Sequence, residues 1–231
     1  MNIGIMQPNY LPWLGYFDML ARSDIFVIYD DVQFDKNGWR NRNKILNYPE
    51  PLWLTAPVLT ADRSHQIIRE VSLANSPWQK KHLKTLRHVY SKAPFFEWCY
   101  PELDLYLTKY NYKYLLDLCI NGHHVFSKLL GIESQLRFSS EIGFANIGRT
   151  ERLVAICSNL CGTCYIAASA SRAYMIEEQW RLANIELRYQ DYTHPVYPQS
   201  GNYFVGHLSV IDSLMFLGPK ARQLIGHVPA C

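Results

Sequence analysis

The sequence predicts an α/β fold: a three-layer, Rossmann-like single domain over residues 1–231, with a mostly parallel sheet and a helical insertion at about residues 76–131. Two observations indicate this fold. Strand-like and helix-like segments alternate at both ends of the chain, whereas the middle is mainly helical. The chain also has 231 residues, of which 48% are hydrophobic and 19% charged. This composition supplies one large core and excludes disorder and coiled coil.

Seven segments combine apolar runs with turn residues at their ends, as strands do. In chain order they are Asn2–Met6, Ile25–Asp30, Trp53–Val58, Arg69–Leu73, Gln135–Ser139, Thr163–Ala168 and Ile185–Tyr192. Between them, apolar residues recur at helical spacing. The predicted helices are Leu14–Ala21, Pro77 to about Ser91, Leu105–Ile120, His124–Leu130, Arg149–Leu160, about Ala173–Leu182, Val210–Phe216 and Lys220–Ile225.

Several residues mark where these helices begin and end. Ser76 is a predicted N-cap, with Pro77 at the first helical position. Pro94 ends the helix that follows, because proline cannot continue one. Gly131 is a candidate for the left-handed residue that closes the middle helical region.

The loop after the first predicted strand is rich in rings and prolines. Ligands of open α/β sheets bind outside the carboxyl ends of strands, so we expect a site here. The polar groups of Gln7, Tyr10 and Tyr16 would face the ligand, with Pro12 and Trp13 in the same stiff loop. A rigid turn whose rings only cover the end of the sheet is the alternative. No glycine-rich phosphate-binding motif occurs in the chain.

Two adjacent carboxylates, Asp30 and Asp31, end the second predicted strand. They could hold Mg²⁺, orient an amine or cap the next turn. Basic, amide and aromatic side chains follow, which suit a phosphate or carboxylate unless the segment is only a solvated loop. The candidate binding residues of this region are Gln33, Trp39, Arg40, Asn41 and Arg42.

The last predicted strand is followed by a second loop of the same style, with prolines between polar rings. His194 is its candidate general base, because imidazole titrates near neutral pH. The other candidate binding residues of this loop are Gln190, Tyr192, Tyr197 and Gln199. Ser169 and Ser171 follow another strand and could donate hydrogen bonds to an oxyanion or phosphate, or cap the next helix.

The predicted helix from Pro77 to about Ser91 is basic and contains no acid. Its cations are Lys80, Lys81, Lys84 and Arg87, and His82 on the same helix is a candidate binding residue. An exposed, solvated face is the simpler interpretation. A docking face for an acidic partner is the alternative.

The overall charge and the apolar runs limit the remaining partners. The net charge of +3 and the absence of a recognised binding motif argue against nucleic acid. No apolar run approaches the ~20 residues that cross a bilayer, so we expect a cytoplasmic protein with no membrane span.

Cys161 and Cys164 form a lone CxxC pair without a second pair or histidine, which predicts reduced cysteines and no metal site.

Taken together, these motifs are similar to those of the WbqC-like protein family, over nearly the whole chain. The matching blocks are MQPNYLPWLGYF, SDIFVIYDDVQF, NRNK, WLTAPV, TERLVAICSNL, QDYTHPVYPQ and LSVIDSLMFLGP. The stretch after Tyr165 departs from the family pattern, as does the segment after Asp212.

The resemblance implies a part in the biosynthesis of O-antigen, related polysaccharides or natural products, with aminoacyl (glycine-type) or acyl transfer to a sugar or amine acceptor. For such a reaction His194 would be the base, and Gln7, Tyr10 and Tyr16 would stabilise the tetrahedral intermediate. Asp30 or Asp31 would bind an ammonium group. If the acyl donor were a carrier-protein thioester, the basic face with Lys80, Lys81, Lys84 and Arg87 would dock the acidic carrier. No cofactor is firmly implied; Mg²⁺ and a nucleotide are the candidates. A nucleotide-dependent enzyme that activates a carboxylate or sugar, and a non-catalytic binding protein, remain alternatives.

Overall fold

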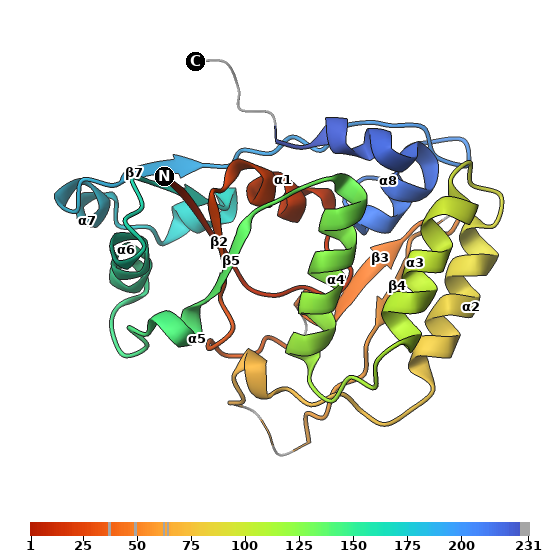
Figure 1. The fold of residues 1–231 in the computed structure, drawn as a ribbon, viewed down its shortest axis with the longest axis horizontal. Helices are drawn as coiled ribbons and strands as arrows, with labels where there is room; N and C mark the ends of the chain where they lie inside the picture. Colours follow the sequence, from red (N-terminus) through yellow and green to blue (C-terminus); the bar gives the residue numbers. More distant parts are fainter. Residues whose placement is uncertain (37, 49, 62, 64, 227–231) are drawn as a thin grey trace.

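The computed structural model describes residues 1–36, 38–48, 50–61, 63 and 65–226. Within these ranges the main sheet has five strands, in the order β5-β2-β1-β6-β7 (Figure 1). Their bounds are β1 Asn2–Met6, β2 Ile25–Ile28, β5 Gln135–Phe138, β6 Cys164–Ala167 and β7 Glu186–Tyr189. All four neighbouring pairs are parallel. The predicted Rossmann-like α/β class is confirmed.

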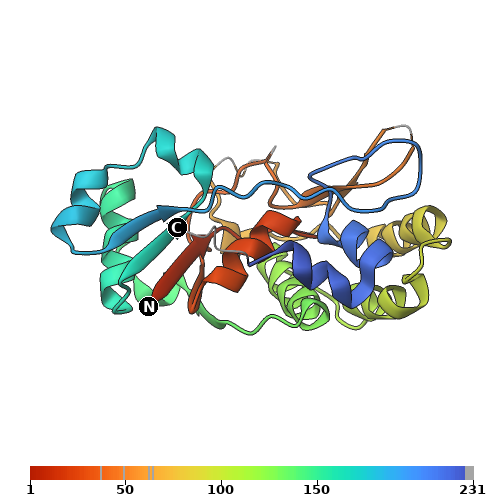
Figure 2. The same cartoon turned by 90° about the horizontal axis from the view of Figure 1, so that it is seen from above.

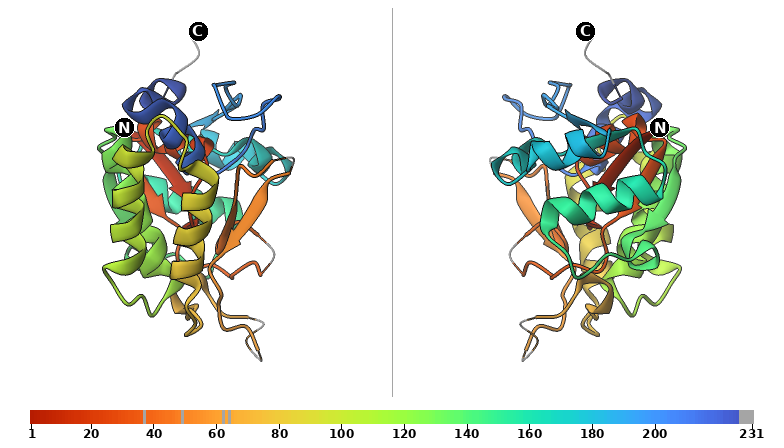
Figure 3. Two further views of the ribbon diagram at one scale, coloured as in Figure 1. Left: turned by 90° about the vertical axis from the view of Figure 1, so that its right-hand side faces the viewer. Right: turned by 90° about the vertical axis from the view of Figure 1, so that its left-hand side faces the viewer.

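Helices cover both faces of this sheet, which gives three layers (Figure 3). The helices are α1 Leu14–Arg22, α2 Trp78–Tyr90, α3 Phe96–Thr108, α4 Leu115–Leu130, α5 Ser139–Ile142, α6 Arg149–Asn159, α7 Glu177–Leu182 and α8 Val210–Leu217. Short 3-10 turns occur at η1 Ile68–Glu70, η2 Ser169–Ala173 and η3 Gly218–Leu224.

The alternation of strand side chains divides the core into two clusters. Ile3, Val27 and Tyr165 point to one face and pack with Ile156 of α6 and Trp180 of α7. Their neighbours in the strands point to the other face, where α1, α2, α3, α4 and α8 form the larger cluster. Figure 2 shows these helices gathered on the far side of the molecule from α6 and α7.

Two of the predicted elements are wrong, and a third is a strand that lies outside the main sheet. The helix predicted over Leu105–Ile120 spans the end of α3 and the start of α4, because one apolar pattern merges two helices. The strand predicted over Arg69–Leu73 contains the turn η1, and only isolated bridges join Leu73 and Ser72 to other segments. The predicted Trp53–Val58 strand is β4, Leu52–Thr55, which pairs outside the main sheet.

The hairpin partner of β4 was not expected from the sequence. β3, Arg42–Ile45, pairs antiparallel with β4. Its RNKI sequence has a single apolar residue, because the buried position of Asn43 is filled by an amide that donates to the carbonyl of Leu11 at 2.6 Å. Because a polar residue that bonds to a distant segment occupies this buried position, the alternation of apolar and polar residues that predicts a strand is absent.

Two of the predicted helix ends can be compared with the structure. Gly131 follows α4 with φ +62°, the expected left-handed conformation. Ser76 is not the N-cap of α2: Pro77 takes that position, with no side-chain hydrogen bond to the helix.

The order of the strands reverses beside β1. From β1 the chain builds outward through β2 to β5, then crosses over to build β6 and β7 on the opposite side. The carboxyl ends of β1 and β6 therefore lead into loops that leave in different directions. A crevice at this edge is the usual ligand site of such sheets.

Two tyrosine–histidine pairs fasten the loop between β1 and α1, and the first turn of α1, to the helical layer. The hydroxyl of Tyr10 is 2.8 Å from Nδ1 of His82 on α2, and that of Tyr16 is 3.0 Å from Nδ1 of His123 on α4. All four side chains are buried. Each pair satisfies two polar groups that would be costly to bury alone.

Acid should destabilise the fold through these histidines. Burial lowers the pKa of His82 to about 4 and of His123 to about 3, whereas an unfolded chain titrates at about 6.5. The unfolded state therefore binds more protons below that pH. The contribution of the neutral imidazoles to the free energy of unfolding is complete above pH ~6.5. It is lost as the pH falls toward the folded pKa values. Urea melts should show the free energy of unfolding falling by up to about 1.4 kcal/mol per pH unit for each histidine.

The double substitution Tyr16→Phe with His123→Phe tests this assignment. It removes both polar partners together, so one proton fewer is bound on unfolding in acid. The slope of the free energy of unfolding against pH should become correspondingly shallower. His88→Phe, on the exposed face of α2, is the control and should leave the slope unchanged. A double variant with the parent slope would show that His123 is not held neutral in the folded protein.

Candidate functional site

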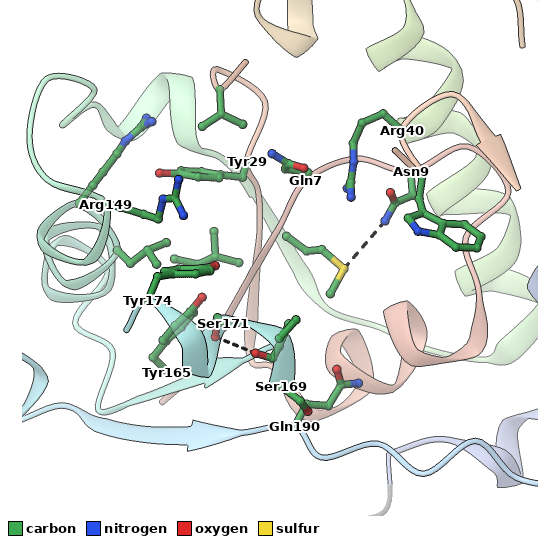
Figure 4. A pocket seen from close by; sticks show the side chains of 18 of the residues that line it. Gln7, Asn9, Tyr29, Arg40, Arg149, Tyr165, Ser169, Ser171, Tyr174 and Gln190 are labelled. Atoms are coloured by element: carbon green, nitrogen blue, oxygen red, sulfur yellow. Dashed lines mark hydrogen bonds between the residues drawn. The ribbon is translucent and has the colours of Figure 1, made fainter. Parts of the chain in front are cut away.

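A cavity of about 990 Å³ lies at the carboxyl edge of the sheet, where the strand order reverses (Figure 4). Gln7 follows β1, Tyr29 follows β2, Ser169 follows β6 and Gln190 follows β7, and all four line it. The parallel pairing places these strand ends side by side. The expectation of a crevice at this edge thus matches the position of the cavity.

The lining of the cavity is cationic. It includes Arg40, Arg149 and Arg152, and none of the described lining residues is an aspartate or glutamate. Among these three arginines, only Arg152 forms an ion pair with a described residue: its Nη2 lies 2.6 Å from Asp31, which does not line the cavity. Arg149 is exposed, with its guanidinium 4.6 Å from the ring centre of Tyr174. An anionic ligand is the natural complement of such a wall.

Aromatic rings and hydroxyls form the wall at the Arg149 end. Tyr29, Tyr165 and Tyr174 surround this end, and Tyr165 stacks on buried Trp180 with the ring centres 4.6 Å apart. Burial raises the pKa of Tyr29 and of Tyr165, so both phenols stay protonated and can donate hydrogen bonds. This end can bind a planar or sugar-like group beside an anion.

Nine of the predicted binding residues line the cavity. They are Gln7, Trp13, Gln33, Trp39, Arg40, Ser169, Ser171, Gln190 and Tyr192. Some of their polar groups already have partners. Nε2 of Gln190 donates to Asp18 at 2.8 Å, and the hydroxyl of Ser171 donates to the carbonyl of Ala168 at 2.7 Å.

The remaining predicted residues of the first loop lie away from the cavity. Tyr10 and Tyr16 point into the helical layer, where burial raises the pKa of each phenol, and His82 is the partner of Tyr10 there. The carbonyl of Pro12 accepts from the backbone of Val210 at 2.8 Å. The polar tips that suggested ligand contacts are instead satisfied by helix residues distant in the chain.

The two aspartates after β2 also bind within the protein. Asp30 accepts from the backbone and the hydroxyl of Ser140, at 3.0 and 2.8 Å, and so caps α5. Asp31 pairs with Arg152. Neither carboxylate lines the cavity, and no cluster of metal-ligating side chains occurs in the described ranges. Mg²⁺ binding through this pair stays a prediction.

Asn41 and Arg42 hold the β3–β4 hairpin together. The amide of Asn41 donates to the carbonyl of Ala56 at 2.9 Å. The guanidinium of Arg42 lies 4.5 Å from the ring centre of Trp53. Neither residue lines the cavity, although the neighbouring Trp39 does.

The loop after β7 places its histidine behind the cavity wall. His194 is half-buried, with Nδ1 3.0 Å from the carbonyl of Pro195 and a buried Nε2 that has no partner among the described residues. Burial lowers its pKa, with a smaller effect from His207. His207, whose ring centre is 4.9 Å away, is the imidazole that lines the cavity.

Tyr197 and Gln199 from the same loop bind a buried carboxylate. Asp212 of α8 accepts from Tyr197 at 2.8 Å, from Gln199 at 2.6 Å and from Tyr90 of α2 at 3.0 Å. Burial raises its pKa to about 6. This cluster joins the last loop to the helical layer, away from the cavity.

Several lining residues were missed by sequence reasoning. They are Asn9, Tyr29, Asn43, Arg149, Arg152, Tyr165, Tyr174 and His207. Arg149 and Arg152 are spaced by three at the start of α6, which places them on one side of a helix. That spacing directly after Gly148 was the signal available in the sequence.

The basic helix α2 has an exposed, unpaired charged face. Lys80, Lys81, Lys84 and Arg87 are exposed, and no ion pair joins them to any described residue. The Arg87 guanidinium lies 4.6 Å from the ring centre of Tyr100 on α3. The expected exposed face is present.

No helix in the described ranges is both long and apolar enough to span a membrane.

Cys164 and Cys157 are buried, whereas Cys161 is exposed, and all three thiols are free. Burial raises the pKa of Cys164, so this thiol is not activated as a nucleophile.

Comparison with known proteins gives one family. The model of the WbqC-like protein family matches residues 7–224, from the residue after β1 to the end of η3. A curated relative from Mycobacterium tuberculosis, the uncharacterized protein Rv1507c, is 34% identical over 233 residues, covering 97% of each chain. No solved structure was found to match.

Substitutions at Asp212 should separate charge from hydrogen bonding. Its folded pKa of about 6 exceeds the usual unfolded value of about 3.9. The stability from this difference is complete below the unfolded pKa and is lost as the pH rises through the folded one. Asn does not ionise, so the Asp212→Asn variant should not lose this stability as the pH rises. The difference in the free energy of unfolding between variant and parent should therefore shift in favour of the variant from pH 4 to pH 7. Urea melts at both pH values measure the change.

Asp212→Leu removes the acceptor of three donors and should cost about 1–3 kcal/mol or more at either pH. If Asp212→Leu were as stable as Asp212→Asn, the three hydrogen bonds would contribute nothing to the fold.

Proposed function

The chain belongs to the WbqC-like protein family, and we propose that it is a transferase that binds a phosphate-bearing sugar or nucleotide in the cavity at the carboxyl edge of the sheet. The observation that carries this proposal is the cationic lining without any described carboxylate. Arginine is the usual partner of phosphate, because its fork of donors matches phosphate oxygens. An ammonium substrate would find no counter-charge on this wall.

The Arg149 end of the cavity offers a cation and aromatic rings, which suit the phosphate and the sugar or base of such a ligand. Arg149 would hold a phosphate, and the rings of Tyr174 and Tyr29 would cover a sugar or base. The position supports this assignment, since nucleotides bind Rossmann-like sheets at the reversal of strand order. A glycine-rich phosphate loop is not required, because side chains supply the donors.

We further propose acyl or aminoacyl transfer to the bound sugar, which forms an amide or ester. The nucleophile, a sugar amine or hydroxyl, must lose a proton as it attacks the acyl carbon. His207 is the cavity-lining imidazole that would take it, with His194 packed behind it in the neutral form. The side-chain amide of Gln7 would donate to the developing oxyanion. The proton returns to the leaving group of the donor.

Nucleotide binding can be measured directly. Thermal shift with a panel of uridine, guanosine, thymidine, cytidine and adenosine diphosphates and their sugar conjugates should find at least one that raises the Tm of the protein, as a ligand at 100 times its Kd adds about 2.7 kcal/mol. Arg149→Gln should weaken that binding about tenfold or more, because it removes a charge-assisted hydrogen bond.

Arg181→Gln is the matched control. Arg181 is an exposed arginine that pairs with Glu178 on α7, outside the cavity lining. It should bind like the parent. If no nucleotide or sugar phosphate stabilises the protein, the proposal of a phosphate-bearing substrate is wrong.

A carrier protein is a second candidate, as the source of the acyl group. The unpaired cations of α2 favour it, because carrier proteins that present thioesters are acidic. We expect the triple variant Lys80→Glu, Lys81→Glu and Lys84→Glu to weaken binding of an acidic acyl carrier about tenfold or more in a titration at low salt. The variant Lys109→Glu, Lys113→Glu and Lys220→Glu carries the same change in charge elsewhere. Equal affinities for the two variants would rule out α2 as the docking face.

A further inference from the structure

The cavity has a second polar end, opposite Arg149. Figure 4 shows the guanidinium of Arg40 and the amide of Asn9 pointing into this end, with Gln7 between it and Tyr29. Arg40 comes from the loop before β3 and Asn9 from the loop after β1. Two segments distant in sequence thus bring a cation and an amide to one corner.

The backbone of Arg40 is held by two contacts, whereas its side chain forms no hydrogen bond or ion pair with a described residue. Its carbonyl accepts from the backbone of Tyr10 at 2.9 Å and from the thiol of Cys119 at 3.7 Å. Nε of Arg40 is buried and has no hydrogen-bond partner among the described residues, and no ion pair is formed. Burial lowers the pKa of Arg40, and the charge of exposed Asp35 on the same loop only partly opposes this.

Asn9 is also unsatisfied. Its side chain is 7% exposed, and its Oδ1 is buried without a partner. Its amide nitrogen has only the sulfur of Met6 at 4.0 Å, a weak acceptor. Buried polar atoms are nearly always paired, so a corner where Nε of Arg40 and Oδ1 of Asn9 have no partner among the described residues is suited to a polar ligand.

We propose that Arg40 and Asn9 form an oxyanion subsite for the second substrate, which carries a carboxylate or phosphate next to an N–H or O–H group. Arg40 and the amide nitrogen of Asn9 donate to the oxyanion, and Oδ1 of Asn9 accepts from the neighbouring donor. This subsite rests on the proposed function in one respect. It assumes that the first substrate occupies the Arg149 end of the same cavity.

The alternative is a structural arginine. Such a residue would place its donors on carbonyls or carboxylates, and its loss would destabilise the protein. A ligand-binding arginine has the opposite effect: the empty site holds an uncompensated charge, so removing that charge should not lower stability. The stability of the free protein therefore distinguishes the two roles.

Asn9→Asp supplies the missing counter-ion within the chain. A carboxylate at this position would pair with Arg40 and compete with any ligand oxyanion. We expect this variant to have a higher Tm than the parent and to lose its response to anions. Arg40→Gln should keep or raise the Tm of the free protein and lose the same response. Asn9→Leu removes the amide without adding charge and should weaken the response.

The probes are sodium glycolate, sodium acetate and sodium phosphate, each compared with sodium chloride at equal ionic strength. Glycolate should raise the Tm of the parent more than acetate does, because only glycolate has the neighbouring hydroxyl. A greater effect of phosphate than of glycolate would assign the subsite to a phosphate, and the reverse to a carboxylate. Either result supports the subsite if the increase disappears in Arg40→Gln.

Arg149→Gln separates this inference from the proposed function. It should keep the glycolate response and lose the nucleotide response, whereas Arg40→Gln should do the reverse. An unaltered anion response in both Arg40→Gln and Asn9→Asp would overturn the subsite while leaving nucleotide binding intact. A lower Tm of Arg40→Gln together with a lower Tm of Asn9→Asp would also overturn it, in favour of a structural arginine.

Discussion

The central position of β1 is the constraint on which the rest of the structure depends. It pairs with β2 on one side and with β6 on the other, both in parallel, so the chain must reverse its direction of sheet growth here. The loops that leave the carboxyl ends of β1 and β6 then go to opposite faces. This divergence opens the cavity, and Gln7 and Ser169 reach it simply because they follow these two strands.

The loop after β1 is kept open by bonds that point away from the cavity. Tyr10 of the loop and Tyr16 of α1 contact buried histidines of α2 and α4, and the carbonyl of Leu11 accepts from Asn43 in β3. Leu11 has φ +48°, a conformation rare for a residue with a side chain, which the surrounding bonds must stabilise. Tyr10 points into the core, whereas its neighbour Asn9 lines the cavity, with its Oδ1 unpaired among the described residues. The bonds that stabilise the fold thus create the unpaired groups of the site.

The sequence was sufficient for the class of fold and for the edge of the sheet that carries the site, because periodicity and the position of strand ends are local. Gln7, Ser169 and Gln190 could be placed on the cavity in this way. The partners of polar side chains could not, because they come from distant segments: Tyr16 meets His123, and Asp31 meets Arg152. Arg149 at the start of α6 and Tyr174 at the end of η2 lie apart in the chain, and only the fold brings both to the same wall.

The stacking of Tyr165 on Trp180 joins the wall of the cavity to the interior of the protein. The two rings are nearly parallel, at 8°, with centres 4.6 Å apart, and Trp180 is 1% exposed. Tyr165 lines the cavity, whereas Trp180 lies behind it in the core. A ring that solvent does not reach therefore supports the wall at this point. Because close-packed interiors yield little, this part of the wall should keep its shape whether or not the cavity holds a ligand.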